Sequence, residues 1–514
     1  MLSSSCRYSF VAACLVLALG CSSPPAETRD AGTGGDAEPL DACTACQPRS
    51  VVSGHATYED LVPAPEGLPL TGPSSPIRRA LVRLVDGAGA VLATGATDDE
   101  GSYSLEVSGA LPTDAALEVE ATHRSATLEA HVVTTADAPY VLRVPVSAAG
   151  VIDAHASADP ASGRLAGPFN ILDRVLLADD FVHALDGGAV LPVFVVRWEL
   201  GGSEGTDATL PEASAFGDAC VVRLLGRVDV DDDAFDDTVI SHELGHCLDI
   251  AFSSFGPPPW RGHGGDIGID PSLALTEGVA TFLGLSMSGT PLYVDTRGPS
   301  DGFAADLESP DAIELGLDGE FAVAAALWDL VDAPMPDDDP FSIPLSMFWS
   351  VLTEDIHDGE YKSVHTYLDA FVARGFATDA ELDAAFGARF ELHRPADPTY
   401  PLVMLVPGTP VLETVDATVG SHLDVRPRSA AMDHFGITLS ARTHVVLTLT
   451  ITDTTSDIDL YLQDADRRGI TMAATTGPGD VIDTTLDPGN YVLVAWAYGD
   501  VDPAARYELV LTTP

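Results

Sequence analysis

HELGH, residues 242–246, lies in the segment TVISHELGHCLDIAF (residues 238–252) and is the most informative stretch of the chain. Its spacing places His242 and His246 on one face of a helix, one turn apart, where both imidazoles can reach a single Zn²⁺. Glu243 stands beside them as a candidate general base for a water molecule activated by the metal. The stretch therefore predicts a metal-binding helix that still needs a third protein ligand.

Glu277 is the candidate third ligand, because it lies in LTEGVATFL (residues 275–283), a second predicted helix. A ligand set of three histidines would need a glycine and a histidine where this chain has Asp249 and Phe252, so that class is excluded. Two histidines and a glutamate leave the fourth coordination position open for water, whereas structural zinc sites usually have four protein ligands. If Glu277 is not the ligand, the next candidates are Asp249, Asp266 and Asp270.

The composition restricts the classes of partner. The 514 residues include 78 acidic and 25 basic side chains, for a formal net charge of −53. This charge repels nucleic acid and anionic lipid surfaces, so neither is expected to bind. The length is too great for a single core and predicts several folded units.

The N-terminus has the features of an export signal, with Arg7 before an apolar run over residues 10–19 and a small residue before Cys21. LALGC (residues 17–21) resembles a bacterial lipobox, which implies a signal peptide over residues 1–20 and a lipidated Cys21; ordinary secretion is the alternative. Residues 21–50 are predicted to be a disordered tether, in which Cys43 and Cys46 are expected to form a local disulfide. We expect an extracytoplasmic protein, either a bacterial outer-membrane or cell-surface lipoprotein held only by its anchor, or a secreted one.

Three folded units are predicted after the tether. Residues 51–146 contain short alternating runs typical of a β-sandwich, residues 147–403 change to helical periods with some strands, and residues 404–514 return to strands separated by turns. The expected fold is therefore multidomain: a β-sandwich, an α+β metal-binding domain and a C-terminal β-sandwich.

Each unit resembles a known family. PIRRALVRL (residues 76–84) and TDDEGSYSL (residues 97–105) are similar to the carboxypeptidase regulatory-like domain. HELGH, TEGVATFL (residues 276–283) and GEFAVAAALWDLVD (residues 319–332) resemble the gluzincin metallopeptidases of the fungalysin-like or thermolysin-like branch. DIDLYL (residues 457–462) and PGNYVLV (residues 488–494) resemble the bacterial pre-peptidase C-terminal domain, a jelly-roll-like sandwich.

The central resemblance implies a zincin-like fold and a zinc metallopeptidase acting on protein or peptide substrates. Thermolysin-like enzymes have an aspartate four residues after the ligand glutamate, where this chain has Thr281. Thr281 or Asp249 could then lie behind the ligand histidines. A donor to the oxyanion is also required. We favour His357 among five candidates, which are His263, Tyr293, His357, Tyr361 and His365.

Two further features concern cysteines and aspartates. Cys220 and Cys247 are predicted to form a disulfide between a strand and the HELGH helix, with two buried free cysteines as the alternative. Asp236 and Asp237, at the end of an aspartate-rich segment (residues 229–237), are expected to cap that helix. The aspartate cluster could bind Ca²⁺, but a solvated turn is favoured because the segment lacks the glycine and terminal glutamate of an EF-hand loop. Asp457 and Asp459 are a second possible Ca²⁺ site.

Two functions remain open from the sequence. The favoured one is a zinc-dependent peptidase with Glu243 as general base. The alternative is a non-catalytic cell-surface binding or adhesion protein built on a peptidase fold. The intact HELGH stretch favours the enzyme, because loss of activity would tend to remove the base first.

Overall fold

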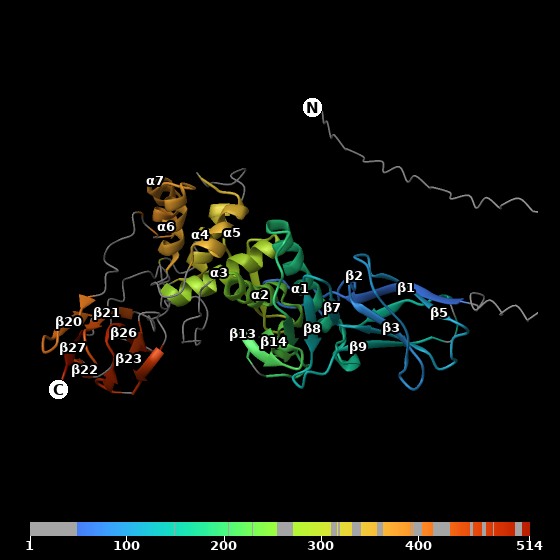
Figure 1. Ribbon diagram of the computed structural model, residues 1–514, viewed down its shortest axis with the longest axis horizontal. Coiled ribbons are helices and arrows are strands. Elements are labelled where there is room, and N and C mark those ends of the chain that lie inside the picture. Colours follow the sequence, from blue (N-terminus) through green and yellow to red (C-terminus); the bar gives the residue numbers. More distant parts are fainter. Residues whose placement is uncertain are drawn as a thin grey trace, which may run out of the picture. The chain divides into compact units, whose positions relative to one another are not determined.

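The computed structural model describes residues 49–146, 148, 150–203, 205–228, 230–253, 271–309, 316, 319–331, 341–356, 363–390, 392, 394, 403–414, 432–452, 456–464, 469–475, 477–498 and 506–514. These residues are rich in β-strands, which form several separate sheets (Figure 1). None of the helices described has the length and apolar character needed to span a membrane.

Two sheets contain most strands of the first predicted unit, and one of them also includes β10 and β11, which lie beyond residue 146. One has the order β4-β3-β6-β9, and in the other β1 pairs with β2, β5, β10 and β11. Tyr103, Leu105 and Val107 are buried at alternate positions of β5, as expected when one face of a strand lies on a core. The bounds are β1 Arg49–Glu59, β2 Ser74–Pro76, β3 Leu81–Val85, β4 Val91–Ala96, β5 Ser102–Ser108, β6 Ala116–Glu120, β9 Val141–Pro145, β10 Gly150–Val151 and β11 Ala154–Ala156.

A third sheet joins segments that the sequence assigned to different units. Its order is β13-β14-β12-β8-β7, with β8 parallel to β12 and β12 parallel to β14. The boundary predicted at residue 146 therefore does not separate two cores. β8 is buried along Ala130–Val133, as expected for a strand inside a parallel sheet with both faces covered. The bounds are β7 Thr122–Arg124, β8 Glu129–Val133, β12 Phe194–Arg197, β13 Asp207–Ser214 and β14 Gly217–Arg223.

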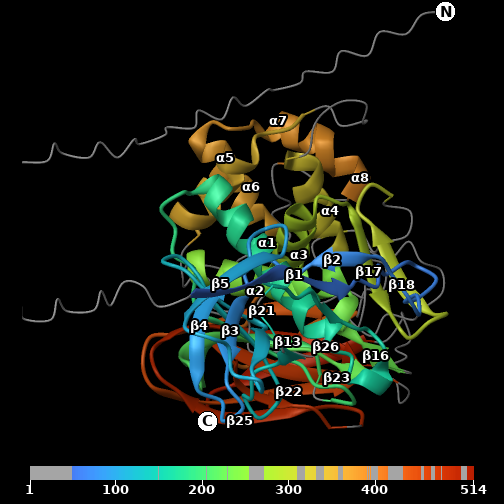
Figure 2. The same cartoon turned by 90° about the vertical axis from the view of Figure 1, so that its right-hand side faces the viewer.

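Helix α1 lies between β8 and β12 in the chain, and the other helices follow β14. Two small β-hairpins, β15–β16 and β17–β18, also follow β14, and the second is clear in Figure 2. The hairpin bounds are β15 Gly226–Arg227, β16 Asp231–Asp232, β17 Leu292–Thr296 and β18 Gly302–Asp306. The helices are α1 Ala166–Leu185, α2 Asp237–Phe252, α3 Pro271–Ser288, α4 Glu320–Val331, α5 Leu345–Glu354, α6 Val364–Arg374, α7 Asp379–Leu382 and α8 Ala388–Phe390, with short 3₁₀ turns at Pro160–Ser162 and Asp233–Phe235 and a π-helical turn at Asp383–Gly387.

Helices α2 and α3 approach closely because glycines line their contact. A Cβ atom at Gly245 would lie 2.3 Å from the carbonyl oxygen of Ala280, and one at Gly284 would lie 2.7 Å from the carbonyl carbon of Ser241. Both distances are too short for a side chain, so only glycine allows this packing. The close approach brings the HELGH helix against the helix that carries Glu277.

The C-terminal unit is a β-sandwich with its own core. Its two sheets have the orders β19-β21-β26-β23-β24 and β20-β27-β22-β25, and buried side chains from both sheets form one cluster. The alternating pattern predicts strands over residues 445–451, 458–462, 484–486, 491–498 and 507–512, and each lies within an observed strand. The jelly-roll-like type of the sandwich stays a prediction. The bounds are β19 Val403–Met404, β20 Val411–Thr414, β21 Met432–Leu439, β22 Thr443–Ile451, β23 Asp457–Asp464, β24 Gly469–Ala473, β25 Val481–Leu486, β26 Gly489–Tyr498 and β27 Arg506–Thr512.

Candidate metal centre

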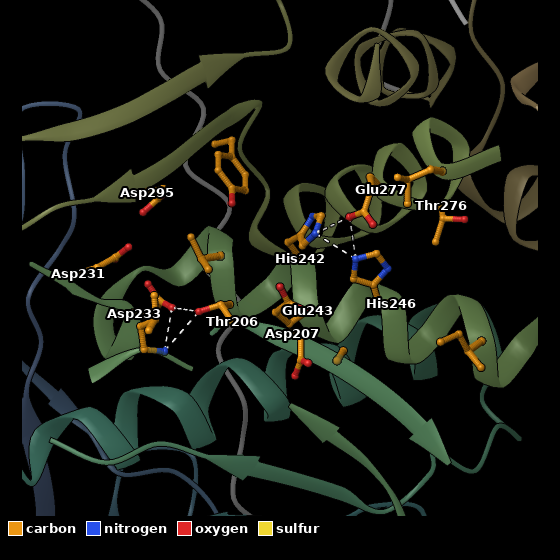
Figure 3. Close-up of a pocket in the computed structure, with 16 residues that line it drawn as sticks. Thr206, Asp207, Asp231, Asp233, His242, Glu243, His246, Thr276, Glu277 and Asp295 are labelled. Carbon is orange, nitrogen blue, oxygen red and sulfur yellow. Dashed lines mark hydrogen bonds and ion pairs between the residues drawn. The ribbon is translucent and has the colours of Figure 1, made fainter. Parts of the chain in front are cut away.

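Three predicted metal ligands come together between α2 and α3. Nε2 of His246 lies 3.1 Å from Nε2 of His242 and 3.0 Å from Oε2 of Glu277. Nε2 of His242 lies 3.2 Å from the same carboxylate oxygen. The three side chains are only 12%, 13% and 8% exposed for His242, His246 and Glu277. Figure 3 shows them facing one another.

This donor set fits a zinc ion. Two imidazoles and one carboxylate are ordinary zinc ligands, with bonds of about 2.0–2.1 Å that set tetrahedral donors about 3.3 Å apart. The separations of 3.0–3.2 Å between the three donor atoms are close to that value. With three protein ligands, the set also leaves one position for water or substrate.

A contact with Thr281 on α3 orients the imidazole ring of His242. Its Nδ1 atom lies 2.8 Å from Oγ1 of Thr281, which follows Glu277 by one helical turn on α3. A histidine that binds metal through Nε2 carries its proton on Nδ1 and donates it to such a partner. The partner of His242 is therefore a hydroxyl group. Asp249 is a buried residue of α2, and the pKa of Tyr367 on α6 is raised mainly by burial and also by the charge of Asp249.

His242, His246 and Glu277 line a cavity of about 310 Å³. Glu243 lines this cavity beside the two histidines (Figure 3) and is 6% exposed. Its place next to the ligands is the one that a general base for a metal-activated water requires. The other lining residues include Thr206, Asp207, Leu225, Asp231, Asp233, Val239, Ile250, Leu273, Thr276, Tyr293 and Asp295.

Of the five candidate oxyanion donors, Tyr293 of β17 lies in the cavity. Its ring packs edge-on against His242, with 6.3 Å between the ring centroids. Burial, with smaller effects from the charges of Asp295 and Glu243, raises the pKa of the phenol well above its usual value. Tyr293 therefore keeps its proton at neutral pH and can donate a hydrogen bond. Nothing in the local sequence favours Tyr293 over the other candidates, because its position depends on the β17–β18 hairpin.

The other predicted site residues have different outcomes. His365 is described but does not line the cavity; burial and the charge of Arg394 lower its pKa to about 4. The remaining predicted positions lie outside the described residues: Cys21, Cys43, Cys46, His263, Asp266, Asp270, His357 and Tyr361.

The disulfide between Cys220 and Cys247 is confirmed. It joins β14 to α2 at the residue that follows His246, with a Cα–Cα distance of 5.9 Å. Both cysteines are fully buried. The bond ties the helix that carries His242 and His246 to the sheet.

The aspartates before α2 are not a solvated turn, so this prediction was wrong. Asp233 and Asp236 are only 2% and 0% exposed. Asp236 is the N-cap residue of α2, but its carboxylate accepts hydrogen bonds from Thr296 rather than from the helix. Asp295, which sequence reasoning missed, joins Asp231, Asp233 and Asp236 in one cluster. No local signal could have found it, because it comes from the distant β17 strand.

Comparisons with known proteins give little further information. No protein family and no curated protein matches the chain. The pre-peptidase C-terminal domain of a Bacillus anthracis collagenase is similar at 12% identity over 23% of this chain and 99% of that domain, with a TM-score of 0.18. The Aeromonas hydrophila lysozyme inhibitor PliG is similar at 11% identity over 22% of this chain and 97% of that protein, with a TM-score of 0.14. TM-scores this low support no argument about function.

Proposed function

We propose that this protein is a metal-dependent peptidase that hydrolyses peptide bonds in protein or peptide substrates, with Zn²⁺ held by His242, His246 and Glu277. The observation that carries the proposal is the convergence of these three donor atoms, 3.0–3.2 Å apart, in one cavity with Glu243. The resemblance of the HELGH, TEGVATFL and LWDL segments to gluzincin peptidases supports the same function.

Each group has a chemical role in this proposal. Zinc held by such a set polarises a carbonyl group and makes water acidic near neutral pH. Glu243 accepts the proton of the attacking water and passes it to the leaving nitrogen. Tyr293 donates its phenolic hydrogen to the oxygen that gains negative charge. Thr281 holds the ring of His242 in the orientation that directs Nε2 to the metal.

We also propose that the protein acts outside the cytoplasm, anchored through Cys21 or secreted. The Cys220–Cys247 disulfide supports this setting, because such bonds persist mainly in oxidising compartments.

The first test replaces Glu243 by glutamine, which keeps the shape of the side chain but cannot accept the proton. Hydrolysis of an unfolded protein, such as reduced and alkylated casein, should fall by about 10²–10⁴-fold. Zinc content should stay at the wild-type level, because Glu243 is not a ligand. Glu66→Gln is the matched control, since Glu66 is exposed and does not line the cavity.

Two results would count against the proposal. An unchanged rate for Glu243→Gln would remove Glu243 as the base. A wild-type protein that binds zinc but hydrolyses no member of a mixed peptide library would favour the non-catalytic binding protein. Glu277→Ala tests the ligand set in parallel: zinc should be lost, and undiminished zinc would direct attention to Asp249, Asp266 or Asp270.

A further inference from the structure

The β17–β18 hairpin, which carries Tyr293, contacts a loop of the first predicted unit. This loop (residues 60–73) joins β1 to β2 and includes a tight turn in which the backbone N–H of Gly67 donates to the carbonyl oxygen of Ala64 over 2.8 Å. Gly67 is buried, whereas the preceding Glu66 is exposed. Figure 2 shows the loop, in blue, reaching the yellow-green hairpin. Two segments far apart in the chain therefore meet at this hairpin.

The contact is made by backbone atoms. The N–H of Leu68 donates to the carbonyl oxygen of Gly298, in the loop between β17 and β18, over 2.9 Å. Gly67 has a φ of +127°, and a Cβ atom there would lie 2.6 Å from the backbone nitrogen of Ser300 and 2.7 Å from the carbonyl carbon of Pro299. Glycine alone combines this backbone conformation with so close an approach. A side chain at position 67 would therefore force the hairpin loop to move.

The contacts continue from this loop to the candidate metal centre. Gly302, at the start of β18, faces the same turn, because a Cβ atom there would lie 3.0 Å from the carbonyl oxygen of Pro65. The next residue, Phe303, packs its ring against that of Tyr293, with 6.2 Å between the ring centroids. Tyr293 packs edge-on against His242. A contiguous series of contacts therefore links the first unit to the phenol beside the proposed zinc ligand.

The hairpin needs support from other elements to hold a fixed position. Among the described residues, β17 and β18 pair only with each other, and a two-stranded hairpin is marginally stable by itself. The start of α2 supports β17, where Thr238 bonds to the backbone of Val294 and Asp236 accepts from Thr296. The loop from the first unit supports the other end, at the hairpin loop and the start of β18. The position of the hairpin therefore depends on both.

We propose that Gly67 is a positioning residue for Tyr293, so that the first β-sandwich unit contributes directly to catalysis. This inference rests on the proposed function, in which Tyr293 donates a hydrogen bond to the oxyanion. Gly67 does not line the cavity and acts only through the hairpin loop and Phe303. Such a role affects the rate because a misplacement of a catalytic group by about 1 Å can cost about 10²-fold.

The test is Gly67→Ala in the zinc-loaded full chain, assayed with a fluorogenic peptide taken from a site in casein that wild type cleaves. The new Cβ atom must displace the hairpin loop by several tenths of an ångström, so kcat should fall by about 10-fold with KM and zinc content unchanged. In the Tyr293→Phe background, the same substitution should change kcat by no more than about twofold, because the positioned donor is already absent. Gly109→Ala is the matched control, since Gly109 also has a positive φ, of 96°, but its Cβ would meet no described atom within 4 Å.

Hydrogen–deuterium exchange over residues 292–306 is a second readout that needs no activity. Exchange there should be about 5-fold faster in Gly67→Ala than in wild type and unchanged in Gly109→Ala.

Three outcomes would overturn the inference: an unchanged kcat, an equal loss of kcat in the wild-type and Tyr293→Phe backgrounds, or unchanged exchange over the hairpin. A wild type that cleaves no peptide would refute the proposed function instead, and the exchange measurement alone would then decide whether Gly67 positions the hairpin. If Gly67→Ala fails to fold, Gly302→Ala makes the same comparison from the hairpin side of the contact.

Discussion

Replacement of Thr281 by valine should weaken zinc binding by about 10–100-fold, which corresponds to about 1.4–2.8 kcal/mol. The magnitude follows from the surroundings of the hydroxyl group. Thr281 is only 2% exposed, and its Oγ1 lies 2.8 Å from Nδ1 of His242. Valine has nearly the same shape but leaves the Nδ1–H donor buried without a partner, and such a loss costs about 1–3 kcal/mol.

The assay is competition for zinc with a fluorescent chelator at fixed pH. Thr281→Ser should restore most of the affinity, because serine supplies the hydroxyl again. Ser286→Ala is the control on the same helix, since the Ser286 hydroxyl is buried and lacks a hydrogen-bond partner among the described residues. An affinity for Thr281→Val within twofold of wild type would refute the reasoning, and so would an equal loss in Ser286→Ala.

Two further predictions concern the phenol and the disulfide. Tyr293→Phe should lower kcat by about 10²–10³-fold with unchanged zinc content, because one donor to the oxyanion is lost. Steady-state kinetics with metal analysis would check this. An unchanged kcat would exclude Tyr293 as the donor. Replacing both Cys220 and Cys247 by alanine should lower the free energy of unfolding by about 3–4 kcal/mol, from loop entropy across a sequence separation of 27. Urea unfolding would measure the loss, and equal stability of variant and wild type would contradict it.

The local features of the metal centre could be predicted from the sequence. The spacing of His242 and His246 requires only helical geometry, and the helix predicted to carry HELGH is found as Asp237–Phe252. Thr281 follows Glu277 by four residues, so the same helical face carries both. The pairing of Cys220 with Cys247 was also predictable, because few cysteines remain after the N-terminal segment.

The parts that could not be predicted depend on pairing between distant segments. Asp295 joins aspartates about sixty positions earlier because the β17–β18 hairpin folds against the start of α2, where Thr238 bonds to the backbone of Val294. β8 pairs with β12, although more than sixty residues separate them. Hydrophobic alternation indicates that a segment is a strand, but it does not specify its neighbours.

The position of β8 in the third sheet has a consequence for proteolytic processing. Cleavage near residue 146 followed by release of the N-terminal piece would remove β7 and β8, and would expose one edge of β12. An open edge in a buried parallel sheet leaves backbone N–H and C=O groups unpaired and promotes association with other chains. The segment before residue 146 is thus part of the framework of the candidate metal centre, and it is not suited to be a discarded prosegment.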